Sequence, residues 1–194
     1  MESGLKIAIV DENPSRAAIL EEGLREAGHH NVARIADRTN LLARLTSLDP
    51  DVILIDLESP SRDVLEQMFQ VSRVVKRPVA MFVDRADAAS IEAAIDAGVS
   101  AYVVDGLKKE RIRHVLDMSI SRFRAFSRIQ AELDKTKIAL EERKVIDRAK
   151  GILMGAKKLS EEAAYALMRK TAMNEKRRIA DIAQSIVTAA ELLK

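Results

Sequence analysis

The sequence contains no cysteine and no tryptophan, only three histidines, and few aromatic residues of any kind. Without cysteine the chain cannot form disulfides, thiolate zinc sites or iron–sulfur clusters. His29, His30 and His114 are too few for a histidine-based metal or acid–base site. No apolar run approaches the ~18 residues of a membrane-spanning helix, and the first residues lack the basic segment and cleavage site of a signal peptide. These absences predict a cytoplasmic protein with no membrane partner.

Proline and net charge both divide the chain. All four prolines lie within residues 1–78, and residues 121–194 contain only two glycines, so we expect the second half to be helical. Residues 1–120 carry 15 basic and 20 acidic residues, a net charge of −5, whereas residues 121–194 carry 17 and 10, a net charge of +7. An acidic half joined to a basic half suggests two tasks, and the basic half favours a polyanionic partner.

The first half alternates short apolar runs with helical patterns. The runs have strand length and are rich in β-branched residues; they are 5–10, 31–36, 51–57, 78–83 and 100–104. The helical patterns lie between them, at 14–28, 39–48, 61–76 and 88–97. Runs with little polar alternation are typical of strands covered on both faces. The sequence therefore predicts an α/β domain, a doubly wound five-stranded parallel sheet.

Three acidic residues follow strands of this predicted sheet. Asp11 and Glu12 come directly after the first strand, and Asp56 ends the third. Active groups collect at the carboxyl ends of parallel strands, and three carboxylates brought together there would repel one another unless a cation such as Mg²⁺ bound between them. With Mg²⁺ bound, a carboxylate can act as nucleophile and accept a phosphoryl group. The alternative is that these acids cap the following helices or remain solvated.

The pattern IAIVDEN, DVILIDLES, PVAMFV and DAGVSAYVVDGL resembles the receiver domain of two-component response regulators, and we assign it to residues 1–118. The resemblance implies that Asp56 is the phospho-acceptor-like residue. It also implies that Asp11 and Glu12 form the acidic metal pair, with Asp56 as the third metal ligand. Tyr102 matches the switch aromatic of the fifth strand.

Two positions depart from the receiver pattern. Where receivers carry Thr or Ser at the end of the fourth strand, this sequence has Val83 followed by Asp84, and where they carry Lys after the fifth strand it has Asp105 followed by Gly106. A carboxylate in place of a cation adds repulsion where an aspartyl phosphate would be stabilised. The hypothesis is that Asp56 is not the working switch and that control comes through a protein contact.

The region 107–150 contains neither glycine nor proline and predicts a long helix. Phe126, Leu133 and Leu140 are spaced by seven, with Ile129 close to a second row, which indicates a weak heptad seam. We therefore expect residues 119–138 to form a helical, coiled-coil linker through which the chain is a homodimer. The alternative is a solvated connector.

Residues 139–194 predict a small all-α three-helix bundle. Its helices are expected at about 138–156, 160–174 and 177–193, with Ser160 as an N-cap and Met154, Met168 and Met173 as core filling. Basic residues gather near the helix ends, which favours contacts with nucleic-acid phosphates over a merely solvated helical surface. The residues expected to bind RNA are Arg148, Lys150, Lys157, Lys158, Tyr165, Arg169, Lys170, Lys176, Arg177 and Arg178. One tyrosine is not a row of aromatics, so recognition should depend on phosphates and on the shape of a folded RNA or a duplex.

The run IDRAKGILM, then SEEAAYALMR, AM and RRIADIA, resembles the ANTAR domain, an RNA-binding antitermination module. Receiver, helical linker and ANTAR together resemble the AmiR/NasT family, and the receiver ending YVVDGL is most similar to its NasT-type members. The resemblance implies binding of a leader mRNA with two hairpins, which prevents a terminator from forming. It further implies nitrate and nitrite assimilation genes as targets, and a cytosolic ligand-sensing, NasS-type protein that holds the regulator.

Three other functions are alternatives. A phospho-dependent regulator could bind duplex DNA if helices 160–174 and 177–193 formed a helix-turn-helix. An adaptor could act by protein contact alone, although the basic excess disfavours it. An enzyme is disfavoured because the sequence shows no Ser/His/Asp set and no phosphate-binding glycine loop.

Overall fold

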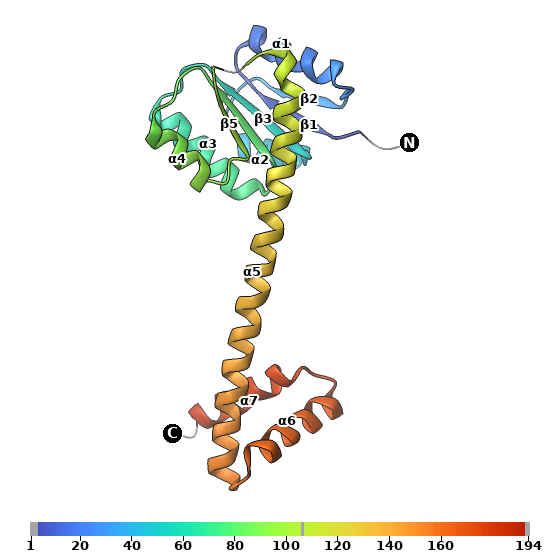
Figure 1. Ribbon diagram of the computed structural model, residues 1–194, viewed down its shortest axis with the longest axis vertical. Coiled ribbons are helices and arrows are strands. Elements are labelled where there is room, and N and C mark those ends of the chain that lie inside the picture. The colour runs from blue at the N-terminus through green and yellow to red at the C-terminus, as the bar shows by residue number, and fades with distance from the viewer. Residues whose placement is uncertain (1–3, 106, 193–194) are drawn as a thin grey trace. The chain divides into compact units, whose positions relative to one another are not determined.

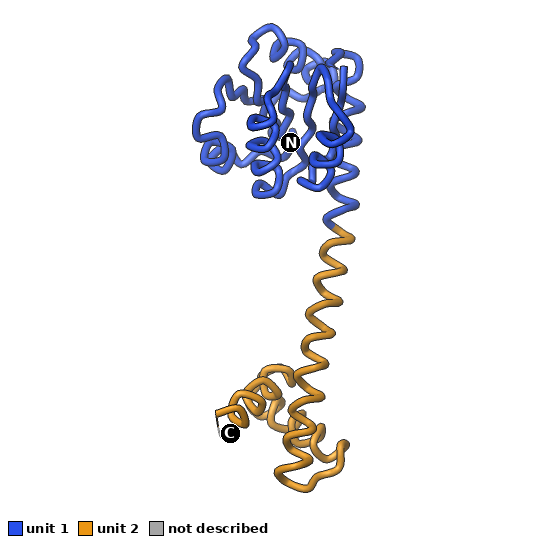
Figure 2. Tube along the Cα trace, turned by 90° about the vertical axis from the view of Figure 1, so that its left-hand side faces the viewer, with its two compact units in different colours: residues 1–127 blue, residues 128–194 orange. Residues whose placement is uncertain are grey.

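The computed structural model describes residues 4–105 and 107–192. The chain divides into two compact units, residues 1–127 and 128–194, which Figure 2 distinguishes by colour. Helix α5 (Lys109–Lys157) contributes residues to both units. The sequence-based division at residues 118 and 138 stays a prediction.

The first unit is a five-stranded parallel sheet between helices (Figure 1). The strand order is β2-β1-β3-β4-β5, and every neighbouring pair is parallel. The strands are β1 (Ile7–Val10), β2 (Val32–Ile35), β3 (Val52–Leu57), β4 (Val79–Val83) and β5 (Ala101–Val104). The helices between them are α1 (Pro14–Glu26), α2 (Leu41–Leu48), α3 (Arg62–Val75) and α4 (Ala88–Asp96). The predicted fold class of this unit is confirmed.

Alternation along the strands builds two cores. Successive side chains of a strand point to opposite faces, so Ala8 and Val10 join a core with α2, α3 and α4, whereas Ile7 and Ile9 join a core with α1 and α5. Strands that are buried on both faces have no polar side to expose. Apolar runs without polar alternation therefore form this sheet.

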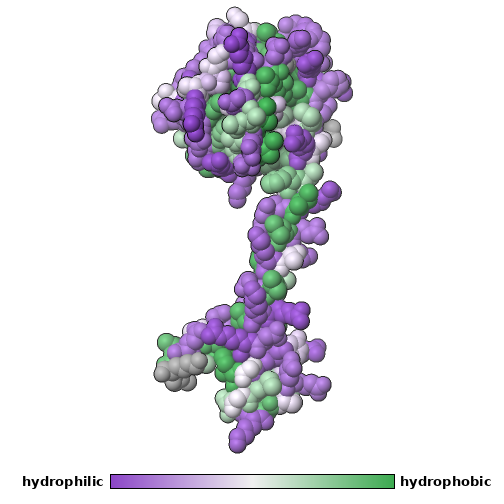
Figure 3. Space-filling view, turned by 60° about the vertical axis from the view of Figure 1, so that its left-hand side comes forward, coloured by the Kyte–Doolittle hydropathy of each residue, from purple (hydrophilic) through white to green (hydrophobic). Residues whose placement is uncertain are grey.

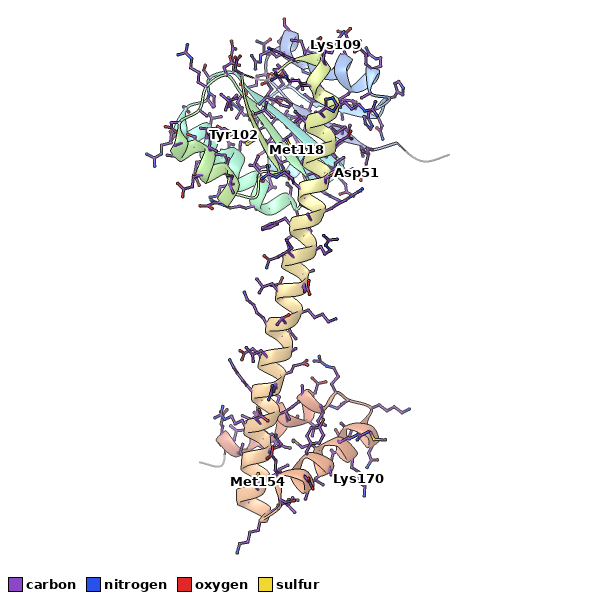
Figure 4. The ribbon with its side chains drawn as sticks, in the orientation of Figure 1. Asp51, Tyr102, Lys109, Met118, Met154 and Lys170 are labelled. Atoms are coloured by element: carbon purple, nitrogen blue, oxygen red, sulfur yellow. The ribbon has the colours of Figure 1, made fainter. Side chains whose placement is uncertain are left out.

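Helices α1 and α5 pack closely against each other at Gly23. A Cβ atom placed on Gly23 would lie 2.7 Å from Cγ1 of Ile112 and 3.0 Å from the backbone oxygen of Lys109. Lys109 also donates to Glu22 and lies 2.9 Å from Glu26, which joins the start of α5 to α1 (Figure 4). A glycine inside a helix ordinarily weakens it, but here the missing side chain makes room for the neighbouring helix.

Replacing Gly23 with alanine is expected to lower the free energy of unfolding of the first unit by about 1–3 kcal/mol, because overpacking at Ile112 outweighs the gain in helix propensity. The matched control is Gly151→Ala in α5, where an added Cβ has open space. This control should gain roughly 0.5–1 kcal/mol. Urea denaturation measures both, and equal gains for the two variants would contradict the contact at Gly23.

The second unit is a three-helix bundle made of the C-terminal part of α5, α6 (Glu161–Glu175) and α7 (Ile179–Leu192). Ser160 caps α6 as predicted, since its side chain accepts a hydrogen bond from the Ala163 N–H. Buried residues from all three helices form the core; they are Ala149, Leu153, Ala164, Met168, Ala172, Ile182, Ala183 and Val187. The predicted small all-α bundle is confirmed.

Three details differ from the sequence prediction. The last helix begins at Ile179 rather than 177, because Lys176 takes a left-handed conformation and Arg177 and Arg178 form the turn. Its predicted end, residue 193, lies outside the described residues. Met168 is buried, but Met173 is 70% exposed. Met154 is also exposed, so these two methionines do not fill the core.

No helix among residues 4–105 and 107–192 is both long enough and apolar enough to cross a membrane.

Candidate signalling pocket and nucleic-acid interface

Three carboxylates lie at the carboxyl ends of neighbouring strands on one side of the sheet. Asp11 directly follows β1, Asp56 is the fifth residue of β3, and Asp84 follows β4. Each falls two residues after a side chain that packs toward α1 and α5; those side chains are Ile9, Leu54 and Phe82. Alternation therefore places all three acids on the α1 side of the sheet.

Arg16, in the first turn of α1, binds two of these acids. Its Nε donates to Oδ2 of Asp56, and its Nη2 donates to Oδ1 of Asp56 at 2.9 Å. The same Nη2 lies 3.0 Å from Oδ1 of Asp84. The Asp56 side chain is only 1% exposed and that of Arg16 is 18% exposed. Bidentate pairing of this kind is the strongest form of a carboxylate–guanidinium interaction.

Asp11 is buried and only half satisfied. Its Oδ1 accepts a hydrogen bond from the Asn13 N–H at 2.8 Å, whereas its Oδ2 has no partner among the described residues. Burial raises the pKa of Asp11 to about 6, and the nearby negative charge of Asp56 acts in the same direction. The surroundings of Asp11 therefore favour its neutral form more than solvent does.

The predicted metal ligands line one cavity of about 430 Å³ but do not form a metal site. Both oxygens of Asp56 face Arg16, and Glu12 pairs with Arg38 at 2.9 Å on the exposed side. Across the described ranges, no three acidic or histidine side chains are arranged to hold a metal ion. The acidic pocket is the place where receiver domains bind Mg²⁺, but with Arg16 in place the arrangement of Asp11, Glu12 and Asp56 does not fit that ion.

The three predicted switch positions have different surroundings. Val83 is buried in the core shared with α3 and α4. Tyr102, labelled on β5 in Figure 4, is half-buried. Its hydroxyl has no partner in the described part of the chain, and burial raises its pKa. Asp105 is exposed in a left-handed conformation and its N–H donates to the Val83 carbonyl. Gly106, which follows Asp105 at the second position that differs from the receiver pattern, lies outside the described residues.

Sequence reasoning missed Arg16. The sequence contains only a weak signal for its role. Arg16 is a basic residue in the first turn of a helix, where the helix dipole disfavours positive charge, and it follows two acidic residues closely. Asp84 was noted as a departure from the receiver pattern, but its contact with Arg16 was not foreseen.

In the second unit, α6 presents one polar and partly aromatic face. Its buried side carries Ala164, Met168 and Ala172. The opposite side carries Tyr165, 43% exposed, together with side chains at helical spacing around a shallow groove; the groove is lined by Glu162, Tyr165, Ala166, Arg169, Lys170, Met173 and Asn174. Lys170 marks this helix in Figure 4.

The predicted RNA-binding cations fall into two groups. The first group pairs with carboxylates of the bundle: Arg148 with Glu191, Lys150 with Asp147 and Glu161, Arg177 with Glu175, and Arg178 with Glu142 and Asp181. The second group has no carboxylate within 4 Å among residues 4–105 and 107–192; it consists of Lys157, Lys158, Arg169, Lys170 and Lys176. An unpaired cation can meet a phosphate without first breaking an ion pair, so the second group is the better candidate for nucleic-acid contacts.

Comparison with known families agrees with both units. Residues 7–117 match the response regulator receiver domain, and residues 134–187 match the ANTAR domain. The chain therefore belongs to the response regulators of two-component systems, and it is an ANTAR response regulator.

Two relatives illustrate the extent of the likeness. The transcriptional regulatory protein PdtaR of Mycobacterium tuberculosis is 24% identical over 182 residues, which cover 94% of this chain and 89% of the relative. The nitrate regulatory protein of Klebsiella oxytoca is 39% identical over 64 residues, 33% of this chain and 16% of the relative. Both are named as regulatory proteins rather than enzymes.

Solved structures match the receiver unit. A putative pilus assembly-related protein of Burkholderia pseudomallei superposes with a TM-score of 0.54 at 22% identity, covering 63% of this chain and 93% of that one. A CheY-like receiver domain protein of Methanospirillum hungatei gives 0.54 at 17% identity, covering 63% and 98%. At these identities the likeness concerns the fold alone.

Proposed function

We propose that this response regulator is a transcription antitermination protein that binds a leader mRNA with two hairpins and prevents a terminator from forming. The observation that carries the proposal is the outward face of α6, where Arg169 and Lys170 have no carboxylate partner among the described residues and lie beside the exposed Tyr165. The ANTAR match over residues 134–187 supports RNA rather than DNA as the ligand.

Lys157 and Lys158 lie where α5 ends and α6 begins, and Lys157 lines a second groove together with Thr171 and Arg177. Lys158 has a positive φ and so turns the chain sharply between the two helices. Tyr165 offers a π-face on which one unpaired loop base can stack, while the lysines and Arg169 contact phosphates. A single aromatic among several cations suits a hairpin loop with an extruded base better than an extended single strand.

Control through a sensor protein, rather than through phosphorylation, is the second part of the proposal. It is supported by Val83 and Asp105 at the positions where receivers place a hydroxyl and a lysine. Lys109, the second lysine after β5, pairs with Glu22 and Glu26 of α1 and so is held by that helix. A cytosolic, NasS-type ligand sensor that sequesters the regulator fits this arrangement.

Nitrate and nitrite assimilation genes are the proposed targets. The support is the partial likeness to the nitrate regulatory protein of Klebsiella oxytoca. A transcription reporter placed behind the candidate leader should show read-through that depends on nitrate and on this protein. Read-through that ignores nitrate would redirect the search to another inducer while leaving the antitermination proposal intact.

The third part of the proposal is a homodimer formed through α5. Along this helix Phe126, Ile129, Leu133 and Leu140 are all exposed, and Figure 3 shows hydrophobic side chains recurring on its surface. Their spacing of three, four and seven residues places them on one seam of the helix. Apolar side chains that recur on one seam are covered when two such helices pair.

Replacing Leu133 with glutamate is expected to weaken self-association by roughly 10- to 100-fold, because two carboxylates would face each other in the seam. Ala131→Glu is the matched control: it adds the same charge to the same helix, two residues away from the seam. Sedimentation velocity over a concentration series measures both variants. Equal association of the two variants would contradict pairing along this seam.

A gel shift at fixed salt tests the central proposal. The full chain is titrated against a two-hairpin leader RNA, the same RNA with scrambled loops, and promoter duplex DNA. Binding to the intact RNA should be at least about tenfold tighter than to the other two. Preference for the duplex would favour the alternative, a phospho-dependent regulator that binds DNA through a helix-turn-helix, and equal weak binding to all three would show nonspecific charge attraction only.

A further inference from the structure

The position of Arg16 is not explained by helix formation. It lies in the first turn of α1, a turn without an acidic residue, where the helix dipole disfavours a positive charge. It is nonetheless partly buried and holds three contacts to two carboxylates. Hydrogen bonding to Asp56 raises the pKa of Arg16 still further, so the side chain stays charged at every physiological pH. A permanently positive group is thus built into a pocket of acids.

We propose that Arg16 is the resident cation of this pocket: its guanidinium takes the place of a divalent cation between the carboxylates. It thereby closes the pocket to Mg²⁺ and keeps Asp56 from accepting a phosphoryl group. The inference concerns the receiver pocket alone and does not depend on the proposed RNA function.

Charge supports this assignment. Asp11, Asp56 and Asp84 gather on one side of the sheet, and Arg16 supplies a charge that is joined to two of them. A divalent cation placed between the same carboxylates would contact the guanidinium directly and be repelled. Entry of Mg²⁺ would therefore first require Arg16 to leave a buried, bidentate pair.

Ligand geometry points the same way. Mg²⁺ demands a nearly octahedral set of oxygen ligands, and a carboxylate nucleophile needs an oxygen with a free lone pair directed at the incoming phosphorus. Both oxygens of Asp56 are already hydrogen-bonded to Arg16. Oδ2 of Asp11, in contrast, is buried and has no hydrogen-bond partner within the described part of the chain, so it is available to a cation once the guanidinium is removed.

The consequence is a receiver pocket whose positive charge comes from Arg16, a residue of the chain itself, rather than from a bound metal ion. Cation concentration and phosphodonors do not act as signals on such a pocket. A regulatory signal must enter at another surface of the chain.

Mn²⁺ titration of the purified full-length protein, followed by the EPR signal of free Mn²⁺, tests the proposal. Arg16→Ala is expected to bind Mn²⁺ at least about tenfold more tightly than the wild type, because the pocket then holds buried carboxylates without a counter-charge. The double variant Arg16→Ala with Asp56→Asn should lose this gain. Arg38→Ala is the matched control, because it removes an arginine that pairs with Glu12 at the same cavity, and it should bind Mn²⁺ as weakly as the wild type.

A folded Arg16→Ala that binds Mn²⁺ no more tightly than the wild type would overturn the proposal. Circular dichroism establishes folding. Should Arg16→Ala fail to fold, the wild type alone decides the matter. Acetyl phosphate with Mg²⁺ is expected to leave its intact mass unchanged, and its Asp11, Asp56 and Asp84 amide signals should not shift on Mg²⁺ titration. Phosphorylation of Asp56 or saturable shifts at these residues would refute the resident-cation assignment.

Discussion

Affinity for the leader RNA is expected to fall about 10- to 100-fold when Arg169 and Lys170 are both replaced with glutamine. Both side chains lie on the outward face of α6 without a carboxylate partner in the described ranges, so each is available to a phosphate. The slope of log affinity against log salt concentration should also decrease by roughly two, because about one counterion is released for each phosphate contact. Fluorescence anisotropy with labelled RNA at several salt concentrations measures both quantities.

The matched control replaces Arg148 and Arg178 with glutamine, which removes the same net charge from the same bundle. These two arginines pair with Glu191, and with Glu142 and Asp181, so the fold already neutralises much of their charge. The control should lose less than about threefold in affinity. Equal losses in the two double variants would show that overall charge, rather than the face of α6, determines binding.

Replacing Arg16 with methionine is expected to lower the free energy of unfolding of the receiver unit by about 2–4 kcal/mol. Removing one partner of a buried ion pair leaves the other charge without compensation, and the estimate is reduced because Arg16 and Asp84 are partly exposed. Asp56, almost completely buried, would carry the larger share of this penalty. Urea denaturation in buffer free of divalent cations measures the change.

The compensating variant replaces Arg16 with methionine and Asp56 with leucine together. Replacing both members of a buried pair with apolar side chains is often close to neutral, so the double variant should recover to within about 1 kcal/mol of the wild type. The double-mutant cycle then measures the coupling free energy between Arg16 and Asp56. Additive losses, with no recovery, would mean that Arg16 stabilises the unit through packing rather than through charge.

The two Arg16 experiments answer different questions. The denaturation cycle asks whether the pair stabilises the fold, and the Mn²⁺ titration asks whether the guanidinium keeps a divalent cation out. A variant that loses stability and regains it when Mn²⁺ is added would connect the two, since a ligand that binds only the folded state stabilises it by mass action.

The parallel sheet, the alternation of strands and helices along the chain and the three-helix bundle could all be predicted from the sequence. Apolar runs such as DVILIDL have strand length and little polar alternation. This pattern is typical of a strand that is covered on both faces. The position of Asp56 at the carboxyl end of β3 followed from the same pattern. Ser160 could be identified as a cap because capping depends on residues that are close in the chain.

Which charged side chains form ion pairs could be learned only from the tertiary structure. Arg16 and Asp56 are separated by 40 positions, and Arg148 and Glu191 lie on different helices, so no local pattern reveals that either pair forms. Met173 was expected in the core but is exposed. The side of α6 that is buried depends on the packing of the whole bundle, which the local sequence does not reveal. Ion pairs and exposure depend on contacts between distant segments. These contacts bring Arg16 to Asp56 in the receiver pocket, and they pair Arg148 and Arg178 with carboxylates of the bundle.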